Sequence, residues 1–403
     1  MDSKAYNNRH RLLIIGFVGF ALITMLAGFS LYSFSGYLYV FFFVFLIIAI
    51  ISYSKDRAVF KPLSKKQSQL WIISWTAMFL LCLVHIHLPP IRLVLYFIYG
   101  ILFLKLDDEI QRKVVDIFVR TLAFLLFFSI AEYILYILFH VGVVLGDVTH
   151  VNVTDFEVPF IQLLFNLIDQ NALIPRFNGL TEEPGLLGTL CGFLLFYTDR
   201  TSNLRVQFYV FLIAGLFSLS LAFFAILAFF AITKITSIKS IVISLIVGSL
   251  VGGLFIHYNR EAFEVLILER VLDNEIGELD NRSSDVFKDH FNKSLKDGSI
   301  ILGHGGYIPE DVFARRADGR YAKGIAGAKK WLFQYGLISF FFVFYAYNKI
   351  YRLRLRRKLR FEDFIFLIIF WISFYQRETI LESYTFLVFM GIPITGYLPK
   401  LEK

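Results

Sequence analysis

The stretch Val206–Thr233, VQFYVFLIAGLFSLSLAFFAILAFFAIT, is apolar almost throughout and decides how the whole chain is arranged. As one helix it would cross a membrane once, whereas a division near Ser218-Leu219-Ser220 gives two crossings. With one crossing, the basic cluster at 349–360 would face outward, against the tendency of Lys and Arg to stay on the cytoplasmic side. We therefore predict two short spans, 206–219 and 220–233. Each would be only about 21 Å long, which requires tilt or local thinning of the bilayer.

Apolar runs of similar kind recur from end to end of the 403 residues, of which 57% are hydrophobic. Such runs are typical of a polytopic helical membrane protein, because a helix satisfies its own backbone within lipid. An outer-membrane barrel would instead show alternating segments of about 10 residues, and the sequence has none. We predict an all-α polytopic fold with a single membrane domain over 1–403. Its twelve predicted spans lie at about 12–33, 37–53, 70–88, 91–104, 116–145, 185–198, 206–219, 220–233, 240–257, 331–348, 361–375 and 383–398.

The distribution of basic residues orients these spans. The last predicted inside loop, 349–360, is the richest in Lys and Arg, whereas the short outside loop 89–90 has none and 376–382 has only Arg377. This positive-inside pattern places both termini in the cytoplasm. It also accounts for the net charge of +8 without a nucleic-acid partner. The two cysteines, Cys82 and Cys191, lie within apolar runs and indicate neither a disulfide framework nor a metal site.

Two outside loops are long, 146–184 and 258–330. In the first, the amphipathic stretch Phe160–Ile174 is too polar to span and predicts an interfacial or re-entrant helix. The second is a charged, soluble-like insert. Such an insert suits an enzyme that acts on a large substrate outside the cytoplasm better than a plain channel scaffold.

A polar motif, Arg176-Phe-Asn-Gly179-Leu-Thr-Glu182-Glu183-Pro184-Gly185, stands at the end of the first long loop. Pro184 suits the first turn of a helix. The start of a helix offers free N–H groups to an anion, and Arg176 adds a bidentate phosphate contact. A carboxylate at this point is a candidate general base for a hydroxyl group. The alternative is structural, with Glu182 and Glu183 capping the helix and pairing with Arg176.

The second long loop contains Arg282 and the glycine-rich sequence Ile301-Leu-Gly303-His304-Gly305-Gly-Tyr307. Glycines let the backbone approach a ligand closely, and His304 is a candidate base or phosphate ligand. The alternative is a tight turn with a structural histidine. A basic run follows that favours an anionic partner or forms a solvated face, and it includes Arg315 and Arg316.

Further polar residues leave both a functional and a structural interpretation open. Arg377 lies with Glu378 and Glu382 in a short outside loop, where they form a salt bridge between helices or join an anion-binding pocket. Glu132, within a predicted span, contacts a loop or a neighbouring helix, or is functional. His85 lacks nearby Cys or carboxylate partners, which favours an interfacial residue over a metal ligand. The chain has no Asp-x-Asp, His-Glu-x-x-His or nucleotide-binding motif, so we expect no metal and no cofactor.

In layout and in three segments, the chain resembles the Wzy-type polysaccharide repeat-unit polymerases of the O-antigen polymerase/ligase superfamily. The three segments are Arg176-x-x-Gly179-Leu-x-x-Glu183-Pro184, Arg282 followed by Leu302-Gly303-His304-Gly305, and Trp331-Leu-Phe-Gln-Tyr-Gly336-Leu-Ile. The ligase branch usually carries Pro-Asn where this chain has Glu183-Pro184. It also has a His-Asn or His-Ser pair before the helix that leaves the long loop, where residues 324–330 of this chain contain no histidine. Both departures favour a polymerase over a ligase.

The resemblance implies a metal-independent glycosyltransferase at the periplasmic face of the bacterial inner membrane. It would transfer a growing glycan from undecaprenyl diphosphate to a hydroxyl group of a lipid-linked repeat unit. Its partners would be that lipid-linked oligosaccharide, membrane lipid and a chain-length regulator. Flippases or transporters of lipid-linked oligosaccharide, and O-antigen ligases, are the alternatives. On this interpretation Arg176, Arg282 and Arg377 bind diphosphate, Glu183 or His304 is the base, and Glu182, Gly303, Gly305, Arg315 and Arg316 support the site.

Overall fold

The computed structural model describes most of the chain, and the statements below concern the described residues alone. These are residues 11–26, 41, 43–44, 47–48, 65–85, 91–142, 144–151, 157–163, 165–169, 176–181, 183–234, 284–313, 327–355, 357–376 and 383–395. The predicted span 240–257 and most of the span 37–53 lie outside them.

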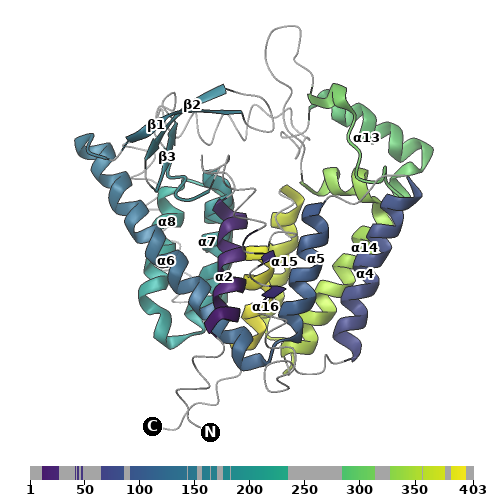
Figure 1. Cartoon of the computed structure of the whole chain (residues 1–403), viewed down its shortest axis with the longest axis horizontal. Helices are drawn as coiled ribbons and strands as arrows, with labels where there is room; N and C mark the ends of the chain where they lie inside the picture. The colour runs from purple at the N-terminus through teal and green to yellow at the C-terminus, as the bar shows by residue number, and fades with distance from the viewer. Residues whose placement is uncertain are drawn as a thin grey trace.

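The described chain is mostly helical, as predicted, and forms a bundle with a small sheet and a short helix at one end (Figure 1). The helices are α2 (Arg11–Leu26), α4 (Lys65–Val84), α5 (Ile91–Lys105), α6 (Asp108–Phe139), α7 (Pro184–Asp199), α8 (Arg205–Phe217), α9 (Leu221–Lys234), α13 (Asp285–Asp297), α14 (Gly327–Leu355), α15 (Phe361–Gln376) and α16 (Ser383–Thr395). Short 3₁₀ turns are η1 (Ser202–Leu204), η3 (Ser299–Ile301) and η4 (Glu310–Phe313). The strands are β1 (Val144–Val151), β2 (Glu157–Leu163) and β3 (Leu167–Asp169).

The division of the apolar run 206–233 is confirmed. Helix α8 ends at Phe217, α9 begins at Leu221, and Leu219 between them has a left-handed φ of 47°. The turn brings α9 back against α7 at two glycines. A Cβ on Gly188 would lie 2.6 Å from the Cβ of Ser220, and one on Gly192 would lie 2.7 Å from Ile226. Small residues therefore let α7 and α9 pack closely, as they do where helices associate within lipid.

Of the described helices, α6 is long and apolar enough to cross a membrane by length and composition. Six shorter apolar helical segments accompany it: Arg11–Met25, Gln69–Val84, Leu93–Lys105, Ser202–Phe217, Leu221–Lys234 and Ser383–Ile394. The twelve-span topology therefore stays a prediction. Helix α6 begins earlier than the predicted span because Asp107 caps it, its carboxylate accepting a hydrogen bond from the Glu109 N–H.

The prediction of an interfacial helix over 160–174 is wrong for the part of this stretch that the structure describes. Residues 160–163 lie in β2 and residues 167–169 form β3, in an antiparallel sheet of order β1-β2-β3. The β2 segment contains aromatic and β-branched residues that suit a strand. Its pairing with β1, from Val144 opposite Leu163 to Val151 opposite Glu157, satisfies its backbone. The hydrophobic periodicity of a single segment does not reveal such a tertiary contact.

Glu132 on α6 connects this sheet to the bundle through hydrogen bonds. Its carboxylate accepts hydrogen bonds from the Phe165 N–H (2.9 Å) and from the Asn166 side-chain amide (3.0 Å), in the turn between β2 and β3. One turn earlier on α6, the Ser129 hydroxyl lies 2.8 Å from Oδ1 of the buried Asn166. The interpretation of Glu132 as a residue that contacts a loop is therefore confirmed.

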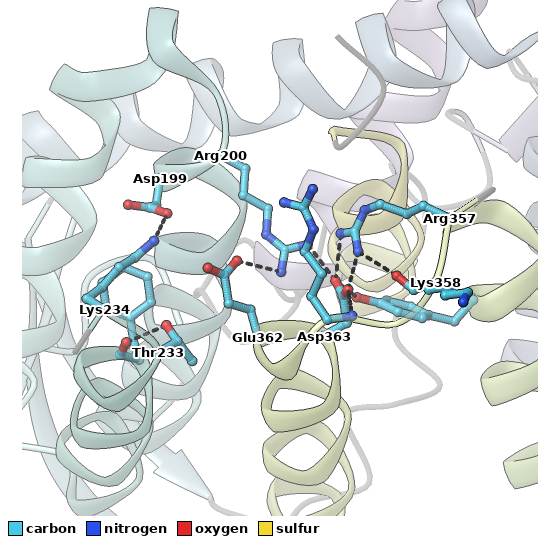
Figure 2. A network of polar contacts seen from close by, with 11 residues as sticks. Asp199, Arg200, Thr233, Lys234, Arg357, Lys358, Glu362 and Asp363 are labelled. Carbon is cyan, nitrogen blue, oxygen red and sulfur yellow. Dashed lines mark hydrogen bonds and ion pairs between the residues drawn. The ribbon is translucent and has the colours of Figure 1, made fainter. Parts of the chain in front are cut away.

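At the opposite end of the bundle, the ends of four helices are joined by charged side chains (Figure 2). Asp363, at the start of α15, accepts hydrogen bonds from Arg200 after α7 (3.0 Å) and from Arg357 after α14 (2.5 Å). Lys234, at the end of α9, pairs with Asp199 at the end of α7. We call Asp199, Arg200, Lys234, Arg357 and Asp363 the charged end. The end that carries the sheet and α13 is called the loop end.

Candidate functional site at the loop end

The glycine-rich sequence predicted to approach a ligand lies against the backbone of α14 instead. Gly303 and Gly336 have left-handed φ angles of 75° and 79°. A Cβ on Gly303 would lie 2.4 Å from the Gly336 nitrogen, and one on Gly336 would lie 2.4 Å from the Leu302 carbonyl carbon. The close approach predicted for Gly303 is therefore real, but it serves contact between two backbone segments. Both positions require glycine.

Gly336 also breaks α14, since its ψ of 164° is far from helical. The break leaves carbonyl groups of the preceding turn without their helical partners, and the loop supplies new ones. The His304 N–H donates to the Phe333 and Gln334 carbonyls at 2.9 and 3.1 Å, and the Gly306 N–H donates to Gln334 O at 2.9 Å. In return, the Gln334 side-chain amide donates to Gly306 O at 2.8 Å. These four hydrogen bonds fix the loop on the helix.

The imidazole of His304 is held by contacts on two sides. Its ring packs against Phe333 with centroids 4.2 Å apart and planes tilted by 32°, and its Nε2 lies 2.9 Å from Ser294 Oγ. Ser294 donates its hydroxyl proton to the His290 carbonyl (3.0 Å), so it accepts a hydrogen bond from Nε2. His304 therefore carries its proton on Nε2 in the neutral state. This leaves Nδ1 as the nitrogen able to accept a proton.

The surroundings of His304 keep it neutral. Burial lowers its pKa, the nearby His85 and His290 lower it further, and Asp297 opposes them. A neutral imidazole at neutral pH is the form that a general base requires. His85 was interpreted as an interfacial residue, yet its ring lies 6.4 Å from that of His304. Separated by more than 200 residues in sequence, the two histidines give no sequence signal of this contact.

Arg176 binds the turn between α8 and α9. Its Nε and Nη2 donate to the carbonyls of Ser218 and Leu219, both at 3.3 Å, where α8 has ended. The next residue, Phe177, is fully buried and donates its N–H to Phe217 O at 3.3 Å. Arg176 therefore has a structural role in addition to the predicted anion-binding role. The anion-binding role stays a prediction and would use the same guanidinium.

Glu183 is the residue that precedes α7, and Pro184 occupies the first turn as predicted. Its side chain makes no capping hydrogen bond to the helix, so the structural alternative of a side-chain cap is wrong for Glu183. The backbone carbonyl of Glu183 instead accepts the Leu186 and Leu187 N–H groups and the Thr181 hydroxyl. The carboxylate is partly exposed, as a group that meets a substrate must be.

The other predicted site residues lie outside the described residues: Glu182, Arg282, Arg315, Arg316 and Arg377. Their convergence with Arg176 on one pocket therefore stays a prediction. Gly305 lies beside His304 with a left-handed φ of 64°. Among the residues that the structure describes, no group of three or more His, Cys, Asp or Glu side chains is arranged to hold a metal ion.

Comparisons of this chain with protein-family models, with curated proteins and with solved structures gave no match.

Proposed function

We propose that the protein is a polymerase that joins undecaprenyl-diphosphate-linked oligosaccharide repeat units into O-antigen or a related surface polysaccharide. The observation that carries the proposal is His304, a neutral imidazole fixed in a glycine-rich loop with a proton-accepting nitrogen. The resemblance to Wzy-type polymerases, described above, supplies the substrate class. We also propose that the loop end faces the periplasm from a multi-pass protein of the inner membrane, with both termini in the cytoplasm.

The proposed reaction is a substitution at the anomeric carbon of the donor glycan. A hydroxyl oxygen of the acceptor repeat unit forms a bond to the anomeric carbon of the donor glycan, and the bond from that carbon to the diphosphate oxygen breaks. The electron pair leaves with the diphosphate, and the hydroxyl proton moves to the base. Diphosphate is a stable leaving group that needs charge stabilisation more than a proton, which arginines provide without a metal. Arg176, Arg282 and Arg377 have this role in the proposal.

Two described residues are candidates for the base. Glu183 offers a carboxylate at the start of α7, and His304 offers Nδ1. Replacing either by Gln keeps its approximate size while removing its ability to accept a proton. A loss of about 100-fold or more in turnover is expected for the true base. Near-normal turnover of Glu183→Gln would show that Glu183 is not the base. The same outcome for His304→Gln would show that His304 is not the base.

The structure weakens one alternative. A flippase needs ionisable groups along a path through the bundle, and Glu132 was the main candidate within a predicted span. Its carboxylate is engaged by Phe165 and Asn166 in the sheet turn. This structural role lowers the support for a transport path there.

The length of the surface glycan in a strain that lacks this gene tests the proposal. Single repeat units on the final anchor are expected for a polymerase. Lipid-linked polymer that accumulates outside the cytoplasm would instead indicate a ligase, and single lipid-linked units on the cytoplasmic side would indicate a flippase.

Complementation with Arg176→Ala should leave single repeat units, because removal of one strong anion contact commonly costs about 100-fold or more in rate. Since Arg176 also holds the α8–α9 turn, Arg176→Lys and a measurement of folded protein are needed beside it. If a folded Arg176→Ala variant made glycan of wild-type length, Arg176 would not be part of the site.

A further inference from the structure

His85, at the end of α4, is placed to act with His304. The two rings have centroids 6.4 Å apart and are tilted by 40°. Nε2 of His85 is buried and has no hydrogen-bond partner in the part of the chain that the structure describes. A buried polar atom without a partner costs free energy unless a ligand satisfies it. The site of His304 thus contains a second imidazole with unused hydrogen-bonding capacity.

The separation of the two rings is compatible with one oxygen atom held between a nitrogen of each. Two hydrogen bonds that share one oxygen separate the nitrogens by up to about 5.6 Å. Rings whose centroids are 6.4 Å apart can present nitrogens at that separation. On the other side of His304, Nε2 is committed to Ser294, so Nδ1 is the nitrogen left for a ligand. A hydroxyl group complements the pair, since it donates one hydrogen bond and accepts another.

We propose that His85 and His304 together bind one hydroxyl group of the acceptor glycan, with His85 as a positioning residue. This inference rests on the polymerase function proposed above. The hydroxyl oxygen accepts a hydrogen bond from His85 and donates its proton to Nδ1 of His304 as it attacks the anomeric carbon. The C–O bond to diphosphate breaks in the same step. His85 holds the attacking oxygen in line and remains unchanged.

The charged and titratable groups around His304 come from α13, from η4 and from the residue that follows α4. Helix α13 contributes Asp297 and His290, of which His290 is paired with Asp311 at 2.9 Å, and α4 leads to His85. Helix α14 contributes the apolar Phe333 and the neutral Gln334. Loss of His85 therefore removes one of the two histidines that lower the pKa of His304, while His290 stays.

The test uses the full-length protein in nanodiscs and lipid-linked single repeat units extracted from the deletion strain. His85→Leu should raise the KM for the acceptor at least 10-fold, with a smaller change in kcat. It should also move the acidic limb of the pH profile of kcat/KM toward higher pH. His85→Gln, which keeps a polar group near the position of Nε2, should recover most of the KM. His140→Asn is the control, because His140 is exposed at the end of α6.

Unchanged acceptor KM in His85→Leu, or equal losses in the Leu and Gln variants, would overturn the inference, because a packing role is not rescued by a polar replacement. A histidine NMR titration without substrate adds an independent arm, in which His304 should protonate at higher pH in His85→Leu than in the wild type. An unchanged titration would also overturn the pairing. If the deletion strain makes glycan of normal length, the polymerase function itself fails, and the pair then fails as an acceptor site whatever the titration shows.

Discussion

The Asp363 carboxylate at the charged end and the two imidazoles at the loop end differ in how fully the protein satisfies their hydrogen bonds. At the charged end, Asp363 is fully buried, yet it accepts hydrogen bonds from the side chains of Arg200 and Arg357 and from the Arg360 N–H. At the loop end, the Nε2 atom of His85 is buried and has no described partner, and His304 keeps one nitrogen for a proton. The difference separates a carboxylate that joins the ends of helices from imidazole nitrogens with capacity left for a ligand.

The contrast also explains why charge alone is a poor guide to the site. The charged end has more ionic side chains in contact than the described part of the loop end. Two of its arginines, Arg200 and Arg357, form ion pairs with the same carboxylate, that of Asp363. Breaking a buried network by removing one member leaves uncompensated charge. The charged end should therefore respond to mutation mainly through stability. The loop end should respond mainly through activity.

The largest effect on stability is expected for Asp363→Ala. Removing the carboxylate would leave Arg200 and Arg357 without their shared partner, at a cost of about 3–5 kcal/mol. Thermal unfolding of the purified protein measures the loss. Glu362→Gln is the matched control, since that carboxylate is 3.5 Å from Arg200 and 35% exposed, and should cost at most about 1 kcal/mol. Equal losses in the two variants would show that the charged end has no special structural role.

An intermediate effect is expected for Gly336→Ala. The added Cβ would meet the Leu302 backbone at 2.4 Å, and the left-handed φ adds strain of about 1–3 kcal/mol. Gly298→Ala provides the control, because its φ of 78° is similar but nothing lies within 4 Å of the added carbon. Gly336→Ala should release the 302–306 loop from α14 and reduce polymer formation more than Gly298→Ala does. Hydrogen exchange at the His304 N–H would report the release, and equal exchange in both variants would contradict it.

The smallest effect is the pH dependence of stability that comes from His304. Because its pKa is lowered in the folded protein, the unfolded chain binds a proton more readily below the ordinary value of about 6.5. Its contribution to stability is therefore present above about pH 6.5 and is lost as the pH falls below it, by less than about 1.4 kcal/mol per pH unit. His304→Gln should flatten the dependence of unfolding on pH in this range. A steeper slope in His304→Gln would reverse the sign of the argument.

The sequence predicted what local chemistry and charge balance determine. The break at Ser218-Leu219-Ser220 followed from the positions of Lys and Arg, and the helix start at Pro184 followed from the residue types. The strands over 157–163 and 167–169 were missed. Their pairing depends on another segment, and the turn between them is held by a hydrogen bond to the Glu132 carboxylate.

The site was predictable only in part for the same reason. The glycines around His304 marked a close approach, but nothing in the loop sequence indicates that the neighbour is the backbone at Gly336. Nor does the sequence around His85 indicate that its ring faces His304. Contacts between segments far apart in the chain, rather than motifs, assemble this site.

The break of α14 at Gly336 has a consequence for the order in which the protein is built. His304 emerges from the ribosome before the Phe333 and Gln334 carbonyls that receive its N–H, and long after His85. The nascent chain therefore contains both histidines before it contains the surface that fixes one of them. Since chains begin to fold during synthesis, the two-histidine site can close only after residue 336 has been added. A chain terminated before that point would carry the motif but not the site.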